Sequence, residues 1–133
     1  MIFIDTNVLL DVVTDDPAWA DWSQQQLDAA SLRDRLAINP VVYSELSVRF
    51  TRIEDIDAML ASVEIVVAEM PRSALFLASQ AFKAYRHRGG PRTSMLPDFF
   101  IGAHATVLGA PLITRDPRRY RSYFPAIELV TPN

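Results

Sequence analysis

The sequence of 133 residues contains no cysteine, which excludes disulfide bonds and metal sites that depend on thiolates. It has two histidines and a single lysine, so a zinc site is disfavoured and nearly all positive charge comes from arginine. The longest stretch without Asp, Glu, Lys or Arg, residues 99–114, is too short to cross a bilayer. The first residues lack the positive charges of a secretory signal. These absences predict a cytoplasmic protein that does not enter the membrane.

The residues that are present fit one compact domain spanning 1–133. Half of them are hydrophobic and 22% are charged, which is ordinary for a globular protein with a core. The net charge of −3 hides an asymmetry, because residues 1–82 carry 13 acids and 5 bases whereas residues 83–133 carry 3 acids and 8 bases. An arginine-rich half permits a nucleic-acid partner, since arginine suits bidentate contacts with phosphate.

Short apolar runs alternate with helical patterns along the chain. Strands are expected at residues 1–4, 36–39, 64–68 and 111–114, with 127–130 as a candidate fifth strand. Helices are expected at residues 6–13, 17–32, 40–50, 53–63, 72–88 and 97–109, followed by a short helix after 116–117. Such alternation produces right-handed crossovers and a parallel sheet covered on both faces. We therefore predict an α/β domain with three layers, α/β/α, around a mostly parallel sheet of four or five short strands.

Four acidic residues lie at comparable places in this pattern. Asp5 ends the first strand, and Asp116 follows the fourth. Asp98 is in the first turn of the helix that Pro97 begins, and Glu45 is near the second turn of the helix after the second strand. Because ligands of open α/β sheets bind beyond the carboxyl ends of the strands, these acids are expected to converge on one edge of the sheet.

Each acid also has a purely structural explanation. Asp5 and Asp116 could cap the helices that follow them, and Asp98 could be a first-turn acid favoured by the helix dipole. Glu45 lies between apolar stripes of its helix, which favours a cleft or the rim of one. Four converging carboxylates, however, would repel one another unless a divalent cation offset their charge. An all-oxygen site of this kind fits Mg²⁺ or Mn²⁺.

The segments around these acids resemble the PIN-domain ribonucleases, and most closely the VapC-type toxins of bacterial toxin–antitoxin pairs. They are IDTNVLLD around Asp5, VVYSEL around Glu45, LPDFFIGAHA around Asp98 and LITRD around Asp116, with gaps of 40, 53 and 18 residues between the acids. The resemblance covers essentially the whole chain. It implies a PIN fold and an endoribonuclease in which all four acids are catalytic and hold one or two Mg²⁺ or Mn²⁺ ions. It also implies inhibition by a cognate antitoxin and assembly as a homodimer.

Polar and basic residues near the acids are further candidates for function. Asn7 and Thr114 are expected either to hold a metal-bound water or a phosphate, or to close the turns after their strands. Arg86, Arg115 and Arg118 belong to two runs that mix arginine with aromatic residues, KAYRHRGGPR and RDPRRYRSYF. Such runs suit contacts with the phosphates and unpaired bases of RNA, and a solvated helix face is the alternative.

Four other residues are interpreted structurally. Asp11, one or two helical turns after Asp5, is expected to be a solvated acid, and His104 is expected to be packed in the core. Trp19 and Trp22 are expected in the core as well, with a dimer or antitoxin interface as the alternative.

Two other functions stay open at this point. A phosphatase of the haloacid-dehalogenase type also begins with an aspartate after an apolar strand, but it needs a second acid where this chain has Asn7. The other alternative is a PIN-like scaffold that binds RNA or protein without cleaving. The presence of all four acids argues against this scaffold.

Overall fold

The computed structural model describes residues 1–91 and 95–132, which form five strands and seven helices. The strands are β1 (Ile2–Ile4), β2 (Leu36–Ile38), β3 (Ile65–Val67), β4 (Leu112–Ile113) and β5 (Leu129–Val130). The helices are α1 (Thr6–Val13), α2 (Ala20–Ser31), α3 (Pro40–Ser47), α4 (Ile53–Ser62), α5 (Arg72–His87), α6 (Pro97–Leu108) and α7 (Arg118–Tyr123). Within this described part of the chain, each helix is too short or too polar to act as a transmembrane segment.

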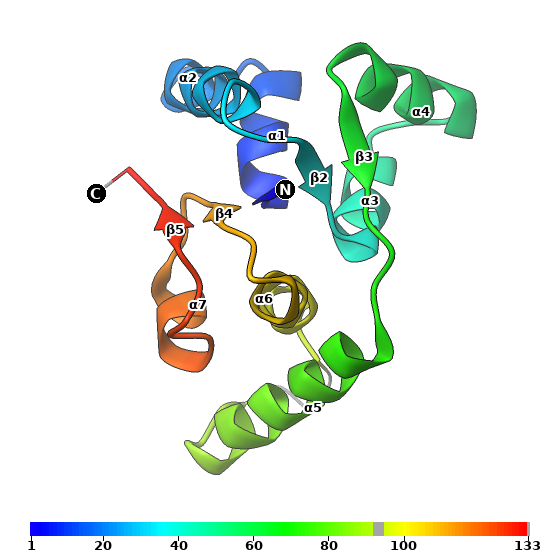
Figure 1. The fold of residues 1–133 in the computed structure, drawn as a ribbon. Coiled ribbons are helices and arrows are strands. Elements are labelled where there is room, and N and C mark those ends of the chain that lie inside the picture. Colours follow the sequence, from blue (N-terminus) through cyan, green and yellow to red (C-terminus); the bar gives the residue numbers. More distant parts are fainter. Residues whose placement is uncertain (92–94, 133) are drawn as a thin grey trace.

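All five strands are parallel and lie in the order β3-β2-β1-β4-β5. Parallel neighbours require crossover connections, and the helices in those crossovers cover both faces of the sheet. Figure 1 shows α1, α2 and α4 on one face of the sheet and α5, α6 and α7 on the other. The three-layer α/β/α architecture predicted from the sequence is therefore confirmed, and the candidate fifth strand is part of the sheet.

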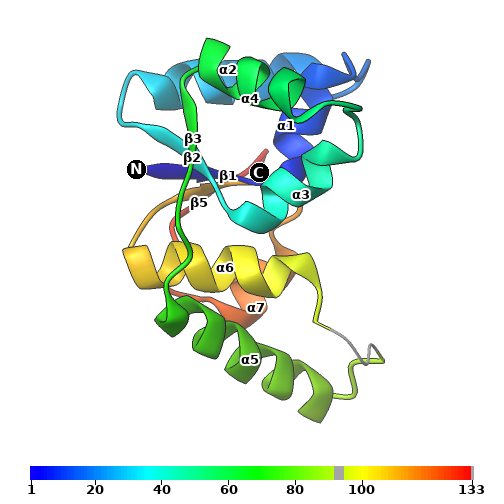
Figure 2. The ribbon, with the colours of Figure 1, turned by 90° about the vertical axis from the view of Figure 1, so that its right-hand side faces the viewer.

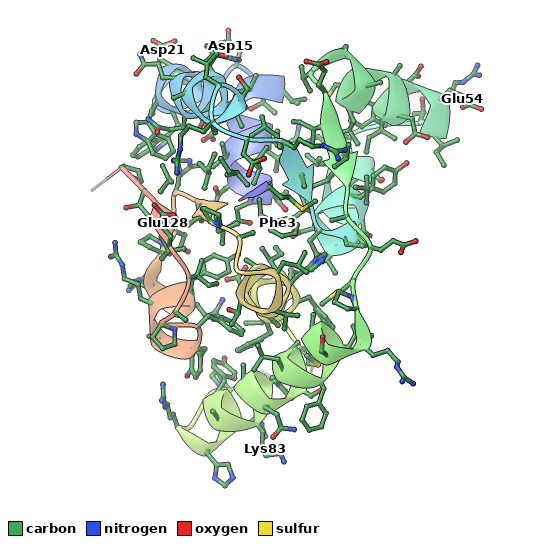
Figure 3. The ribbon with its side chains drawn as sticks, viewed as in Figure 1. Phe3, Asp15, Asp21, Glu54, Lys83 and Glu128 are labelled. Atoms are coloured by element: carbon green, nitrogen blue, oxygen red, sulfur yellow. The ribbon has the colours of Figure 1, made fainter. Side chains whose placement is uncertain are left out.

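β1 and β2 form the middle of the core because helices cover both of their faces. All three residues of each strand are buried. Figure 3 shows Phe3 in the middle of the molecule, whereas Glu54 on α4 and Lys83 on α5 point outward. His104 of α6 is fully buried beside Phe3, with ring centroids 4.7 Å apart, which confirms its predicted place in the core.

The ring of His104 joins three parts of the chain. Its Nδ1 accepts a hydrogen bond from Asn39 Nδ2 at 2.8 Å, and its Nε2 donates to the carbonyl of Glu69 at 3.0 Å. These two hydrogen bonds require the neutral form of the ring. Burial lowers the pKa of His104 and so favours this neutral form. The network ties the end of β2 to α6 and to the segment between β3 and α5.

Residues at the helix starts place α1, α3 and α6 at the carboxyl ends of the strands. Asp5 caps α1 by accepting a hydrogen bond from Thr6 N at 2.8 Å, and Asn39 caps α3 through Val41 N at 2.6 Å. Pro97 occupies the first turn of α6. Figure 2 shows β1 leading from the N-terminus toward the side on which α1 and α3 lie and α6 begins. Functional side chains on these starts therefore share one edge of the sheet.

Two helix boundaries differ from the sequence prediction by three residues, and the others agree within one residue. α2 begins at Ala20 instead of residue 17, because Asp16 accepts hydrogen bonds from Ala18 N and Trp19 N and holds this segment in a turn. α3 ends at Ser47 instead of residue 50, since the next backbone N–H groups bond to carbonyls three residues earlier and tighten the chain.

Candidate functional site

Asp5 is the centre of a buried group of polar side chains at the carboxyl edge of the sheet. It is 5% exposed, and its Oδ1 accepts a hydrogen bond from Thr6 N. Its Oδ2 accepts from Thr114 Oγ1 at 2.7 Å and from Tyr120 OH at 2.9 Å. Burial raises the pKa of Asp5 to about 6, to which the charge of Asp98 adds, and these hydrogen bonds offset only part of the rise. The protein alone therefore does not fully balance the charge of this carboxylate.

Asp98 approaches Asp5 from the first turn of α6, and Tyr120 of α7 lies between them. The hydroxyl that donates to Asp5 is 3.5 Å from Oδ1 of Asp98. Arg119 pairs with the other oxygen, with 2.9 Å between Nη1 and Oδ2. Burial and the charges of both acids raise the pKa of Tyr120 well above its usual range, so its hydroxyl stays protonated and can donate. α7 thus supplies a hydroxyl and a guanidinium to the two acids.

Glu45 reaches the same group from α3. It is half-buried, and its Oε1 accepts a hydrogen bond from Thr6 Oγ1 at 2.6 Å. Because Thr6 directly follows Asp5, this contact holds Glu45 at the rim of the group. The charge of Glu45 also contributes to the raised pKa of Tyr120. The structure thus gives Glu45 the rim position, one of the two that its helical pattern favoured.

Asp116 adjoins the group but is exposed to solvent. Its backbone N donates to Thr114 Oγ1 at 3.1 Å, and that hydroxyl in turn donates to Asp5. Among the described residues, no hydrogen bond or ion pair involves the carboxylate of Asp116. Nor does it cap α7, whose first residue follows Pro117. Capping therefore accounts for part of the role of Asp5 but for none of that of Asp116.

Asn7 and Thr114 close the segment after β4 onto the start of α1. Asn7 Nδ2 is 3.5 Å from both Asp5 Oδ2 and Thr114 Oγ1, and its Oδ1 accepts a hydrogen bond from Arg115 N at 3.2 Å. Thr114 is fully buried. The two side chains therefore fill the turn-closing role and also orient Asp5.

The oxygen atoms of this acidic group are suitable ligands for a hard divalent cation. The group offers carboxylate, hydroxyl and amide oxygens, and the raised pKa of Asp5 records a charge that a cation would balance. With the side chains as they stand, no three acids or histidines in residues 1–91 and 95–132 are close enough to share one ion. In this arrangement Asp98 is paired with Arg119, and Asp116 is exposed.

Comparison with known families decides what kind of domain carries this group. The profile of the PIN domain family matches residues 2–124. The chain belongs to the PIN domain family. No curated protein matches the sequence. The family match confirms the resemblance to the PIN domains and leaves the haloacid-dehalogenase alternative without support.

Solved structures share the fold of this PIN domain over nearly its full length. A chain of VapBC2 from Rickettsia felis, bound to a DNA fragment from its promoter, has a TM-score of 0.74 at 19% identity, with 98% of each chain covered. A chain of a toxin–antitoxin complex from Klebsiella pneumoniae has a TM-score of 0.72 at 20% identity, covering 100% of this chain and 98% of that one. For VapBC-1 from nontypeable Haemophilus influenzae the TM-score is 0.70 at 20% identity, with 98% of each chain covered.

The prediction that Asp11 of the PIN domain is a solvated acid is wrong. Asp11 is 3% exposed, accepts a hydrogen bond from Ser23 Oγ at 2.6 Å, and forms a bidentate pair with Arg115 at 2.6 and 2.9 Å. The guanidinium of Arg115 also lies 4.9 Å from the ring centre of Trp19. A buried carboxylate needs a charged partner, and Arg115 supplies it from the segment after β4. Arg115 therefore holds this segment against α1 through Asp11, which in turn is hydrogen-bonded to Ser23 of α2.

The remaining predicted residues lie at the periphery of the PIN domain. Arg118 at the start of α7 is exposed, and Arg86 in the last turn of α5 donates a hydrogen bond to the carbonyl of Gly90 at 2.9 Å. Trp19 and Trp22 are half-buried, with edge-on rings 6.1 Å apart. Trp22 packs against the edge of the core and Trp19 lies beside Trp22, so neither tryptophan fills the interior.

Sequence reasoning did not single out three residues that shape the site: Thr6, Arg119 and Tyr120. The run RDPRRYRSYF showed that arginine and tyrosine occur together, but not that two of them face the acids. Tyr120 is the buried residue of α7, and its burial depends on the packing of α7 against α6. The residues of α6 and α7 that make this contact are not neighbours in the sequence, so no local pattern predicts that Tyr120 is buried.

Proposed function

We propose that this PIN domain is a Mg²⁺- or Mn²⁺-dependent endoribonuclease that acts as the toxin of a toxin–antitoxin pair. The observation that carries the proposal is the hydroxyl of Tyr120, which lies between Asp5 and Asp98 although these acids are far apart in the sequence. Glu45 and Asp116 adjoin the same group. The PIN family match and the VapBC complexes of similar fold support a nuclease of the VapC type.

Asp5, Glu45, Asp98 and Asp116 are the proposed catalytic residues and the proposed ligands of one or two divalent cations. Their carboxylate oxygens are the ligands that Mg²⁺ and Mn²⁺ prefer. When bound, the cation would lower the pKa of a water molecule for attack on phosphorus and balance the charge on the attacking and leaving oxygens.

The chain's own residues prepare this site before a cation binds. Thr114 and Tyr120 orient Asp5 by donating hydrogen bonds to the same oxygen. Arg119 balances the charge of Asp98, which faces Asp5 across the Tyr120 hydroxyl. Without these donors, the carboxylate of the buried Asp5 and that of the half-buried Asp98 would repel each other.

RNA is the proposed substrate, and exposed arginines at this edge are the proposed phosphate contacts. Arg118 lies at the start of α7, next to the Arg119 that pairs with Asp98, and Arg86 lies in the last turn of α5. The C-terminal end of α5 is on the side where α6 begins (Figure 2). Neutralising phosphates in this manner gives affinity without sequence preference. Arg115 is assigned a supporting role, because it holds the segment before Asp116 in place together with Asn7.

A cognate antitoxin is the proposed protein partner. The solved structures with this fold include chains of VapBC complexes and of a further toxin–antitoxin complex. An antitoxin would inhibit by filling or distorting the acidic cleft. Assembly as a homodimer and a cytoplasmic location stay predictions.

The test is RNA cleavage by the purified protein. Wild type with Mg²⁺ or Mn²⁺ is expected to cut bacterial RNA, and Asp98→Asn or excess EDTA is expected to abolish cutting, because each removes a ligand or the cation. Asp21→Asn is the matched control, since Asp21 is exposed on α2 (Figure 3). Sequencing of the new 5′ ends identifies the cut sites. Equal cutting by wild type and Asp98→Asn would refute the proposal.

A second candidate is a PIN scaffold that binds RNA or protein without cleavage. The pair between Arg119 and Asp98 favours it, because it neutralises one acid without a cation. Calorimetric titration with Mn²⁺ separates the two candidates. Binding that is lost in Asp98→Asn supports the nuclease, and an absence of binding to wild type supports the scaffold.

A further inference from the structure

Two segments that contain arginine and tyrosine meet beside the acidic group. α5 and α7 contact each other and pack on the same face of the sheet as α6 (Figure 1). Between them lies a surface pocket of about 350 Å³. The residues that line it are Tyr85, Asp116, Arg118, Arg119, Ser122 and Tyr123. The two basic-aromatic runs of the sequence thus form one pocket, and one of the four acids is part of its wall.

The aromatic side of this pocket is firmly supported. The ring centres of Tyr85 and Tyr123 are 6.1 Å apart, and both rings contact Phe99 of the core, at 5.4 and 5.7 Å between centroids. Gly90 lies so close to Tyr85 that a Cβ at this position would be 2.3 Å from the ring. Both tyrosines are half-buried, so each ring is held from one side and still offers surface to solvent.

Guanidinium groups lie over both rings. Arg119 is 5.8 Å from the ring centre of Tyr85, and Arg88 is 4.8 Å from that of Tyr123. Arg119 also pairs with Asp98, so the pocket and the acidic group share this arginine. The pocket therefore combines aromatic rings and positive charge directly beside the site proposed for catalysis, and a base that stacks on either ring takes the place of the guanidinium that lies over it.

We propose that this pocket binds one nucleotide of single-stranded RNA, with the base against Tyr85 or Tyr123 and the phosphate on Arg118 and Arg119. The identification of the ligand rests on the proposed nuclease function. An unpaired base stacks on aromatic rings, and arginine binds phosphate in a bidentate manner. An acidic peptide would use the guanidinium groups alone and would leave the two tyrosine rings of the pocket without a partner. The pocket volume, at the lower end of ligand sites, fits one nucleotide.

The test is the binding of a fluorescein-labelled single-stranded RNA decamer, measured by anisotropy in EDTA so that no cleavage occurs. Tyr123→Leu is expected to weaken binding about tenfold, because one stacked base contributes that order of affinity. Tyr123→Phe keeps the ring and is expected to bind like wild type. Arg118→Ala is expected to weaken binding and to reduce the salt dependence by about one charge. Arg33→Ala, which removes an exposed arginine just after α2, controls for overall charge.

Competition between the labelled RNA and unlabelled ligands for the wild-type protein identifies the chemistry of the ligand. This experiment does not depend on the folding of Tyr123→Leu. Adenosine monophosphate is expected to displace the labelled RNA at much lower concentration than inorganic phosphate. Equal displacement by the two would mark a phosphate site without base stacking and would overturn the proposal. Displacement by a deca-glutamate peptide as effectively as by the nucleotide would mark a site for acidic peptides and would overturn it as well. So would equal binding of RNA by Arg118→Ala, Arg33→Ala and wild type.

Cleavage assays with Mg²⁺ separate the failure of this inference from the failure of the proposed function. If wild type cuts RNA and the pocket variants bind and cut equally well, the nucleotide site is refuted and the nuclease stands. If wild type does not cut RNA but Tyr123→Leu and Arg118→Ala weaken binding, the nucleotide site stands and the nuclease is refuted.

Discussion

Replacement of Asp5 by asparagine is expected to stabilise the metal-free protein at neutral pH and to abolish its stabilisation by Mg²⁺. Asp5 is buried, and its pKa is raised from 3.8 to about 6, so the folded state disfavours the ionised form. Below the lower value the group is protonated in both the folded and the unfolded states and has no effect. As the pH rises toward 6, the unfolded state ionises first, and the folded state loses stability until both are ionised.

The magnitude follows from the difference between these two pKa values. About 2 pKa units correspond to about 3 kcal/mol of lost stability above pH 6. Asparagine removes the charge but places an amide where Oδ2 accepts hydrogen bonds from Thr114 and Tyr120. Re-pairing these hydroxyls costs about 1 kcal/mol. The expected net gain of about 2 kcal/mol would raise the melting temperature by roughly 5–10 °C for a domain of this size.

Thermal unfolding followed by circular dichroism tests this expectation. In EDTA at about pH 7.5, Asp5→Asn should melt above wild type, and at about pH 4.5 the difference should shrink because both folded proteins are then largely neutral at this position. Addition of Mg²⁺ at the higher pH should stabilise wild type, since a ligand that binds the folded state alone raises its stability. The same addition should leave Asp5→Asn unchanged.

Asp11→Asn is the matched control, because Asp11 is buried to a similar degree but has a charged partner. It pairs with Arg115, so removal of its charge leaves that guanidinium uncompensated. We expect a loss on the order of 2 kcal/mol at neutral pH, less than for a fully buried pair because the Arg115 side chain is 26% exposed. If Asp5→Asn instead destabilises as Asp11→Asn does, or has the same effect at both pH values, burial of Asp5 is not costly and the reasoning fails.

Substitutions at three further positions test the core packing and the residues that contact the acids. Gly102→Ala would place a Cβ 2.3 Å from the ring of Phe124 and is expected to destabilise by about 1–3 kcal/mol in denaturant unfolding; an unchanged midpoint would show that the ring yields freely. Arg115→Met is expected to lower the melting temperature because Asp11 loses its counter-charge, and Arg115→Lys should restore only part of it, since lysine cannot form the bidentate pair. Tyr120→Phe keeps the ring and removes the hydroxyl, so we expect Mn²⁺ affinity by calorimetry to fall about tenfold and stability to fall by about 1–2 kcal/mol, because Asp5 loses a hydrogen-bond donor; equal affinity would contradict this positioning role.

Most of the fold could be predicted because its signals are local. Asp5 and the pair Asn39-Pro40 begin α1 and α3 where the sequence indicated, and Gly109 ends α6 in the left-handed conformation, with φ 62°. The buried strands were visible as short apolar runs between these signals. Alternation of strands and helices then leaves few topologies, because crossovers between parallel strands are right-handed.

The contacts within the site could not be predicted, because they join residues that are distant in the chain. Nothing in the sequence around Asp11 indicates that it is buried, since its partner Arg115 lies 104 residues away. The spacing of the acids predicted that they share one edge of the sheet. It cannot show that the Tyr120 hydroxyl lies between Asp5 and Asp98, or that Arg119 forms an ion pair with Asp98. Such pairings depend on how α7 packs against α6, which is a property of the whole domain.

Arg119 contacts both the acidic group and the adjacent pocket. It is the partner of Asp98 and also lies over the ring of Tyr85. A cation bound by Asp98 would replace the positive charge that Arg119 supplies and release the guanidinium to a phosphate in the pocket. An RNA phosphate that draws Arg119 away would likewise leave Asp98 uncompensated and favour the cation. Mn²⁺ affinity should therefore rise when a non-cleavable 2′-O-methyl RNA is present, and Arg119→Met should remove this dependence. Equal affinities with and without RNA in wild type would show that the two sites bind independently.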